Sequence, residues 1–101
     1  MGLRSIANDE FDNLCVRATQ KPPATMTEAG WYASEDNAFL AVLLHNHKRD
    51  TWEYLIYSRV DLMNCQPAAK GKLFETLDQV ESAITANVKK LAARRAIASR
   101  L

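Results

Sequence analysis

Two histidines and two cysteines are the residues of this chain best suited to chemistry. His45 and His47 follow an apolar run at i, i+2 spacing, which would place both imidazoles on one face of a strand, as in some zinc sites. A zinc ion needs at least one further ligand from Asp50, Cys15 or Cys65, and none of these stands at a diagnostic spacing. Nor does the sequence indicate a Cys–His nucleophile pair with a third group that orients the base. We therefore predict no catalytic residue, no metal and no cofactor: the chain is not expected to be an enzyme.

Length and composition are those of one globular domain covering residues 1–101. The chain has 101 residues, of which 48% are hydrophobic and 25% are charged. This is enough for a single core without disulfides or metals. Only two cysteines occur, far apart, which favours reduced thiols in the cytoplasm. No stretch has the composition of a signal peptide or of a membrane span, so we expect a cytoplasmic protein with no membrane partner.

Three strands joined by polar turns are expected between Gly30 and Val60. Aromatic and branched residues form the segments Trp31–Ser34, Phe39–Leu44 and Trp52–Tyr57, and clusters of Asp, Asn and Lys separate them. This pattern is typical of an antiparallel meander. Both faces of the middle segment are apolar, which predicts a central strand covered on both sides.

Two helices flank this meander. Asp9–Thr19 has helical spacing of its apolar residues, and the C-terminal helix begins at a capping box, Thr76 to Gln79. One stripe of the second helix is apolar: Leu77, Val80, Ile84, Val88 and Leu91. With a short fourth strand near Leu62–Cys65, we predict an α+β fold: an N-terminal helix, a three- to four-stranded antiparallel meander and a long C-terminal helix, in two layers. The sheet face away from the helices would then need a further cover.

The last turns of the C-terminal helix change their apolar face. At 100° per residue, Arg95 falls on the stripe of Leu91, whereas Ile97 and Leu101 lie on roughly the opposite side. Residues 92–101 therefore read as a helical extension beyond the core. We expect a non-catalytic interaction module that forms a homodimer, either through the uncovered sheet face or through the end of the last helix. Ile97, Leu101, Arg94 and Arg95 are the candidate partner-binding residues.

The same helix end is basic, which favours nucleic acid as an alternative partner. Residues 82–101 hold five basic residues and no acidic one. The segment Lys89–Arg95 resembles the second helix of double-stranded RNA-binding domains, as does the order of helix, three strands and helix. In that family, however, the basic motif opens the helix, and a Gly-Pro-His loop joins the first two strands. This chain has neither feature, so the interaction with nucleic acid remains the second choice.

A third alternative is a small-molecule pocket on an aromatic-lined sheet face. Trp31, Trp52, Tyr54 and Tyr57 all lie in the expected meander. Aromatic walls suit apolar or cationic ligands, so these four residues are the candidate ligand-binding group.

About half of the chain carries a recurring pattern. Its parts are Gly30–Asp36, Lys48–Tyr54, Arg59, and Phe74 leading into the final helix, with Lys21-Pro22-Pro23 ending the upstream helix. This pattern resembles small hypothetical proteins of bacterial mobile elements, including phages, conjugative elements and integron gene cassettes. The chain departs from it after Val60, where Asn64–Lys72 replaces a shorter connection. The resemblance implies the same fold and a bacterial setting, and it implies no activity.

Overall fold

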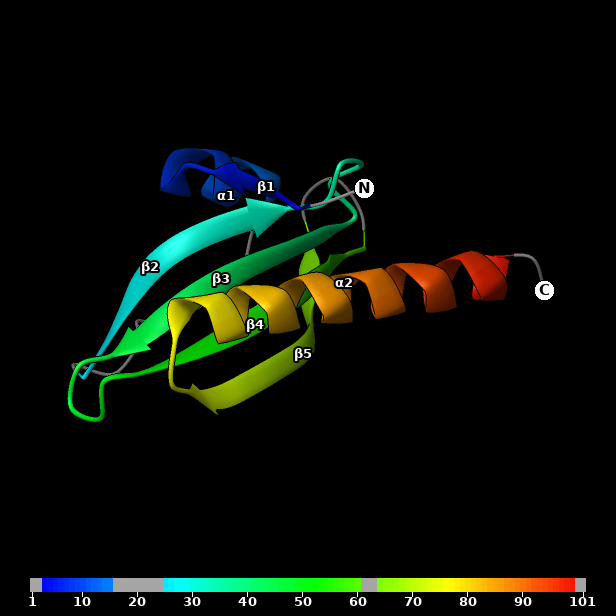
Figure 1. The fold of residues 1–101 in the computed structure, drawn as a ribbon. Helices are drawn as coiled ribbons and strands as arrows, with labels where there is room; N and C mark the ends of the chain where they lie inside the picture. The colour runs from blue at the N-terminus through cyan, green and yellow to red at the C-terminus, as the bar shows by residue number, and fades with distance from the viewer. Residues whose placement is uncertain (1–2, 16–24, 61–63, 100–101) are drawn as a thin grey trace.

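The fold is an antiparallel sheet with one helix on each face (Figure 1). The computed structural model describes residues 3–15, 25–60 and 64–99. The elements in chain order are β1 (Arg4–Ile6), α1 (Asn8–Leu14), β2 (Met26–Ala33), β3 (Phe39–Asn46), β4 (Thr51–Arg59), β5 (Cys65–Phe74) and α2 (Leu77–Ser99). The α+β class, the antiparallel sheet and the long C-terminal helix are confirmed.

Among the described residues, the sheet has five strands in the order β1-β2-β3-β4-β5, so the prediction of three to four strands was too low. The unexpected strand is β1, whose three residues pair with the end of β2. A strand follows β4 as β5, which begins at Cys65, the last residue of the predicted strand; Leu62 and Met63 of that prediction lie outside the described residues. Pro67 lies within β5, opposite Tyr57. An edge strand tolerates a proline because one of its sides makes no ladder hydrogen bonds.

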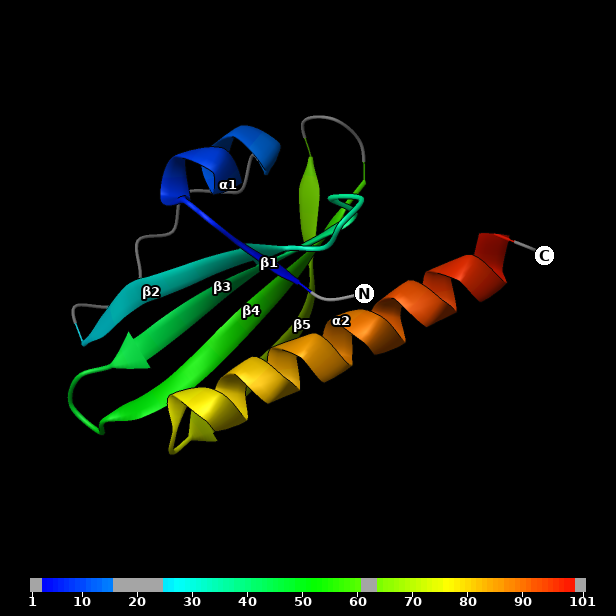
Figure 2. The ribbon, with the colours of Figure 1, turned by 45° about the horizontal axis from the view of Figure 1, so that its top comes forward.

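The two helices cover opposite faces, so the prediction of two layers was wrong (Figure 2). On the α2 face, Val80, Ile84 and Val88 are buried against the odd-numbered residues of β3 and the even-numbered residues of β4. On the α1 face, Phe11 is buried against Leu40 and its neighbours on the other side of β3. Every residue of Phe39–Leu44 is buried, which confirms that β3 is central and covered on both sides.

The N-terminal helix is shorter than predicted. The expected helix ran to Thr19, but α1 ends at Leu14 because the backbone of Cys15 is extended. The side chain of Cys15 nevertheless packs in the same cluster as Phe11. Residues 16–24 lie outside the described part of the chain.

The predicted turns are confirmed, and their backbone explains their composition. Asn37 in the β2–β3 turn and Asp50 in the β3–β4 turn have φ angles of 59° and 53°. Asn and Asp tolerate this left-handed region better than most residues with a side chain. The turns therefore fix the register that places β2, β3 and β4 side by side.

Candidate functional site

Helix α2 starts where the sequence predicts. The hydroxyl oxygen of Thr76 accepts a hydrogen bond of 3.2 Å from the backbone N–H of Gln79. The side-chain oxygen of Gln79 accepts one of 3.1 Å from the backbone N–H of Glu75, one residue before the amide that we expected. These two bonds satisfy donors that a helix end leaves without partners. They fix the rotation with which α2 meets the sheet.

The apolar stripe of α2 packs on the sheet over its middle turns only. Val80, Ile84 and Val88 are buried, and Leu91 is half-buried. Leu77, the first residue of the predicted stripe, is 41% exposed. Helical side chains lean toward the N-terminus, so a residue of the first turn leans away from the packed turns. The stripe ends near Leu91, as predicted.

Beyond Leu91 the helix projects past the end of the sheet (Figures 1 and 2). We call residues 92–99 the overhang. Each of residues 92–97 is exposed, and Ile97 reaches 60% exposure. Of the predicted partner-binding residues, Arg94 and Ile97 lie exposed on the overhang. Leu101 lies outside the described residues.

Arg95 turns back toward the sheet. Its guanidinium carbon lies 5.7 Å from the centre of the Phe39 ring, and its Nη2 donates a hydrogen bond of 3.4 Å to the carbonyl oxygen of Arg59. This position agrees with the predicted stripe, in which Arg95 follows Leu91. Arg95 is therefore an anchor for the base of the overhang, whereas the sequence made it a contact for a partner.

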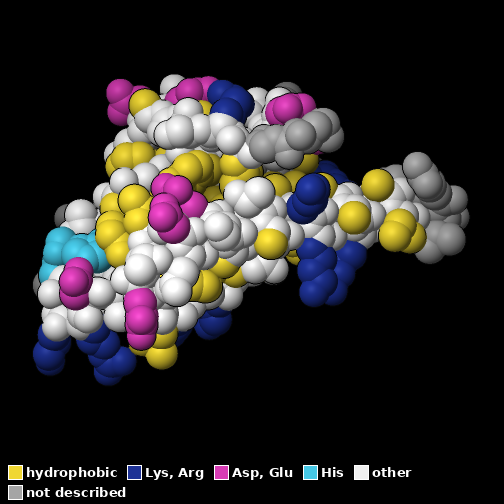
Figure 3. All heavy atoms as spheres, in the orientation of Figure 1, with side chains coloured by type: hydrophobic (Ala, Val, Ile, Leu, Met, Phe, Trp, Pro, Cys, Tyr) yellow, Lys and Arg dark blue, Asp and Glu magenta, His cyan; other side chains and the backbone are white. Residues whose placement is uncertain are grey.

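A groove runs between α2 and the edge of the sheet formed by β1 and the β2–β3 turn. Its main pocket has a volume of about 410 Å³, and a smaller pocket of about 200 Å³ shares Leu3 and Thr85 with it. Hydrophobic side chains line this strip, and charged side chains border it (Figure 3). The main pocket is lined by Leu3, Ser34, Glu35, Asp36, Phe39, Thr85, Val88, Lys89 and Ala92.

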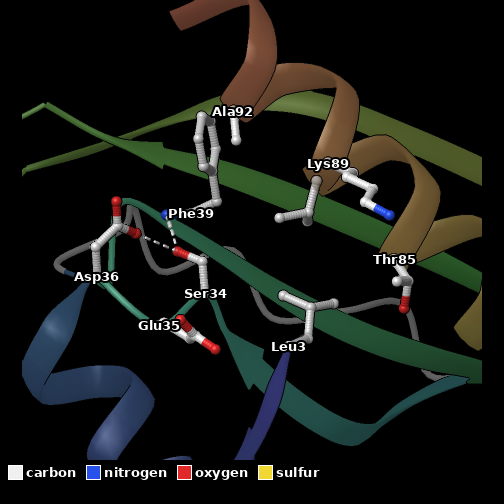
Figure 4. Close-up of a pocket in the computed structure, with 9 residues that line it drawn as sticks. Leu3, Ser34, Glu35, Asp36, Phe39, Thr85, Lys89 and Ala92 are labelled. Atoms are coloured by element: carbon white, nitrogen blue, oxygen red, sulfur yellow. Dashed lines mark hydrogen bonds between the residues drawn. The ribbon is translucent and has the colours of Figure 1, made fainter. Parts of the chain in front are cut away.

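The turn beside the groove is held by a short chain of hydrogen bonds (Figure 4). The hydroxyl of Ser34 donates to Asp36 at 2.8 Å and accepts from the backbone N–H of Phe39 at 3.1 Å. Asp36 also accepts from the backbone N–H of Ala38 at 3.0 Å. The pKa of the Asp36 carboxyl is held below its usual value, mainly by the hydrogen bond from the Ala38 amide. The hydrogen bond from Ser34 and the nearby Arg95 guanidinium lower it further.

Tyr32 ties strand β2 to the helix. Its hydroxyl donates a hydrogen bond of 3.2 Å to the carboxylate of Glu81 on α2. Burial, and then the neighbouring Glu81 charge, raises the pKa of the Tyr32 phenol. The smaller pocket lies along this contact, since both residues line it.

The four aromatic residues predicted to frame one pocket are divided between the two faces of the sheet. Trp31 and Tyr57 pack on the α1 face, whereas Trp52 and Tyr54 pack on the α2 face. Tyr54 is 4% exposed, and its hydroxyl accepts a hydrogen bond from Asn87 of α2. A single pocket framed by all four does not form, because alternate residues of a strand point to opposite faces.

The two histidines are in contact, with their ring centres 4.9 Å apart. The ring of His45 also lies 4.4 Å from that of Trp52, and its Nε2 donates a hydrogen bond of 2.9 Å to Asp50. His47 shares a hydrogen bond with Thr27. Within the described ranges, no group of three or more His, Cys, Asp or Glu side chains is placed to hold a metal ion.

Cys15 and Cys65 are both thiols. They pack in the cluster on the α1 face, where Cys15 is buried and Cys65 is half-buried. Packing accounts for their position without a chemical role.

Sequence reasoning missed the groove. Phe39 and Val88 were recognised as core residues, but the pocket beside them is completed by Leu3 and the β2–β3 turn, which lie far from α2 in the sequence. The nearest signal was Arg95, a charged residue on an otherwise apolar stripe, although Arg95 itself does not line the groove. It marked the place where the helix ceases to pack on the core.

Comparison of this chain with protein-family models, with curated proteins and with solved structures finds no match. Among the residues that the structure describes, no helix is both long enough and apolar enough to cross a membrane. The function must therefore be argued from the geometry alone.

Proposed function

We propose that this chain is a non-catalytic interaction module that forms a homodimer through α2. The observation that carries the proposal is the overhang, a helix end that projects from the sheet with Ile97 60% exposed. A short isolated helix end in water has little intrinsic stability, so a projecting one gains from a partner. The charges along α2 favour a second copy of the same chain as this partner.

The charge of α2 reverses along its length, which makes the helix complementary to itself. Its first turns carry Asp78 and Glu81 and no cation, whereas Lys89, Lys90 and Arg94 follow with no further acid. Two copies packed antiparallel would set the acidic half of each helix against the basic half of the other. A parallel pair would set like charges together, at a cost.

The outer side of α2 suits such a contact. Ser82, Ala86, Ala93 and Ile97 fall within about 60° of one another on a helical projection, and all four are exposed. Small side chains on one line let two helices approach closely. Neither edge strand of the sheet is a good alternative site for dimer formation, because β1 has three residues and β5 carries Pro67 and two lysines. Such features discourage pairing of strand edges.

Light scattering coupled to size-exclusion chromatography tests this proposal. The intact chain at tens of micromolar should have about twice its 11.4 kDa mass. Ile97→Glu, and separately a chain ending at Ala93, should have the single mass. Val60→Glu is the matched control, because Val60 is also 54% exposed but lies outside α2. A single mass for the intact chain would rule the proposal out, and so would a dimer that Ile97→Glu leaves unchanged.

Nucleic acid is the second candidate partner, because Lys89, Lys90 and Arg94 are exposed on a helix end without acids. Each phosphate contact would lower log K by about 0.9 per tenfold increase in salt. Fluorescence anisotropy with duplex DNA and duplex RNA at several salt concentrations measures this slope. Replacing Lys90 and Arg94 with alanine should reduce both the affinity and the slope; equal binding by this variant would dismiss the candidate.

A further inference from the structure

The main pocket of the groove has an apolar floor. Leu3, Phe39, Val88 and Ala92 supply this floor, from the N-terminal segment, β3 and α2. The pocket volume of about 410 Å³ lies in the lower part of the range for ligand pockets, roughly 300–1,000 Å³. The pocket therefore suits one small molecule with an apolar body.

The charge that this pocket presents to a ligand is negative. Glu35 and Asp36 line it from the β2–β3 turn, and Lys89 lines it from α2. Lys89 is exposed, and its side chain extends away from Glu35 and from the Phe39 ring in the close-up view (Figure 4). A ligand on the floor therefore faces the two carboxylates rather than the ammonium of Lys89.

The two carboxylates differ in how far the protein already satisfies them. Asp36 accepts hydrogen bonds from Ser34 and from a backbone amide, and the Arg95 guanidinium lies near it. Arg95 itself is held over the Phe39 ring and does not line the pocket. Glu35 forms no hydrogen bond and no ion pair with any residue that the structure describes. Glu35 is therefore the carboxylate that is open to a cationic ligand.

We propose that this pocket binds a small primary amine with an apolar body, of the class of the aralkyl and branched alkyl amines. The ammonium of the ligand pairs with Glu35, and its apolar body covers the floor. The carboxylates of the turn disfavour an anion, and a neutral ligand leaves the Glu35 charge without a partner. Neither Glu35 nor a floor residue lines the hollow on the outer side of α2, where the proposed dimer forms. The proposal therefore does not depend on the dimer.

The exposure of Glu35 sets the size of the expected selectivity. Ion pairs at exposed positions strengthen an interaction by up to about fivefold. Salt screens such pairs, whereas it does not screen the contact of the apolar body with the floor. The order of affinity among matched ligands, and its dependence on salt, are therefore the informative measurements.

Chemical-shift titration of the isotope-labelled full chain tests the proposal with three ligands of similar shape. The amine is 2-phenylethylamine, which is compared with the neutral 2-phenylethanol and the anionic phenylacetate. We expect saturable shifts at Phe39, Val88 and Ala92. The amine should bind about threefold to fivefold more tightly than the alcohol, and the carboxylate most weakly. The preference for the amine should fall when salt is added.

Three results of this titration would overturn the proposal. The first is shifts confined to residues outside the pocket, and the second is the absence of saturation at millimolar concentrations. The third is phenylacetate bound as tightly as the amine, because the pocket would then not select a cation.

Two variants test the roles of the wall and the floor. Glu35→Gln should remove the preference for the amine over the alcohol, and Glu75→Gln is its control, because Glu75 is exposed and does not line the pocket. Ala92→Phe should fill the pocket and weaken both ligands. Ala96→Phe is its control, because Ala96 is also exposed on α2 but lies outside the lining. If Glu35→Gln keeps the preference for the amine, or Ala92→Phe leaves binding unchanged, the assignment is wrong.

Discussion

Gly71 lies in β5 directly against the ring of Tyr54. A Cβ atom at this position would lie 2.3 Å from Cε2 and 2.7 Å from Cζ of Tyr54, and 2.9 Å from Cε2 of Phe74. Carbon atoms that are not bonded do not approach this closely. Tyr54 cannot easily move away, because it is 4% exposed and its hydroxyl is hydrogen-bonded to Asn87. Gly71→Ala must therefore displace β5 or the packed ring.

The magnitude follows from two opposing effects. Overpacking of this kind costs about 1–3 kcal/mol, whereas alanine lowers the entropy of the unfolded chain and returns about 0.4–1 kcal/mol. We expect Gly71→Ala to lower the free energy of unfolding by about 1–2 kcal/mol. For a domain of this size, the melting temperature would fall by about 4–8 °C per kcal/mol.

Gly30 is the matched control. A Cβ atom there would lie 3.4 Å or more from its nearest neighbours, in ordinary or slightly tight contact, and the φ angle is not left-handed. Gly30→Ala should change the free energy of unfolding by less than about 0.5 kcal/mol. Urea unfolding followed by circular dichroism measures both variants.

A double-mutant cycle identifies the cause. In a Tyr54→Leu background the ring is gone, so Gly71→Ala should cost much less than in the native background. An equal cost in the two backgrounds would refute the reasoning, because the loss would then not arise from contact between Gly71 and Tyr54.

Three further predictions concern the turn and the helix. Asp36→Asn should lower the free energy of unfolding above about pH 4. A carboxyl with a depressed pKa stabilises the fold only while it is ionised. The difference in stability between the variant and the native chain should therefore vanish as the pH falls through the lowered pKa of Asp36. Urea titrations at several pH values check this, and a difference that does not vary with pH contradicts it. Ile84→Ala should lower the free energy of unfolding by about 2–5 kcal/mol because Ile84 is buried. Ile97→Ala in the dilute monomer should lower it by less than about 0.5 kcal/mol. Similar losses of stability in the two variants would disprove the packing described for α2. Thr76→Ala should cost about 0.5–2 kcal/mol through loss of the cap, and Thr85→Ala, inside the same helix, should not be destabilising by this route. Equal losses of stability in these two variants would exclude capping as the cause.

The features that the sequence predicted correctly depend on neighbours along the chain. The apolar run Phe39–Leu44 indicated a central strand, and clusters of Asp and Asn indicated its turns. The cap at Thr76 and the stripe from Val80 to Leu91 likewise follow from spacings of three and four residues. Such signals need no knowledge of the rest of the fold.

The features that were missed depend on contacts between distant segments. Strand β1 has three residues and exists only because it pairs with β2. Strand β5 contains Pro67 and Gly71, which read as a loop until the edge position and the Tyr54 ring explain them. The choice of face for α1 was also open, since both sides of β3 are apolar and either could accept Phe11.

For the candidate site, one error could have been avoided from the sequence. Trp52 and Tyr54 differ by two residues and share a face, whereas Tyr57 is an odd number of residues away and faces the other side. The alternation of the strand was sufficient to separate them. The groove near Lys89 could not be predicted, because it is formed by the N-terminal segment, the β2–β3 turn and α2, which are far apart in the sequence.

The separation of the two buried clusters by β3 has a consequence for the order in which the protein opens. The cluster on the α1 face and that on the α2 face share no residue, so losing one does not expose the other. Helix α1 has seven residues, too few to be stable alone, and its helicity depends on Phe11. Amide hydrogens of α1 and β1 should therefore exchange with solvent in a partial opening that leaves β3, β4 and α2 protected. The slowest exchange of all should occur in β3, whose amides become accessible only when the whole sheet unfolds.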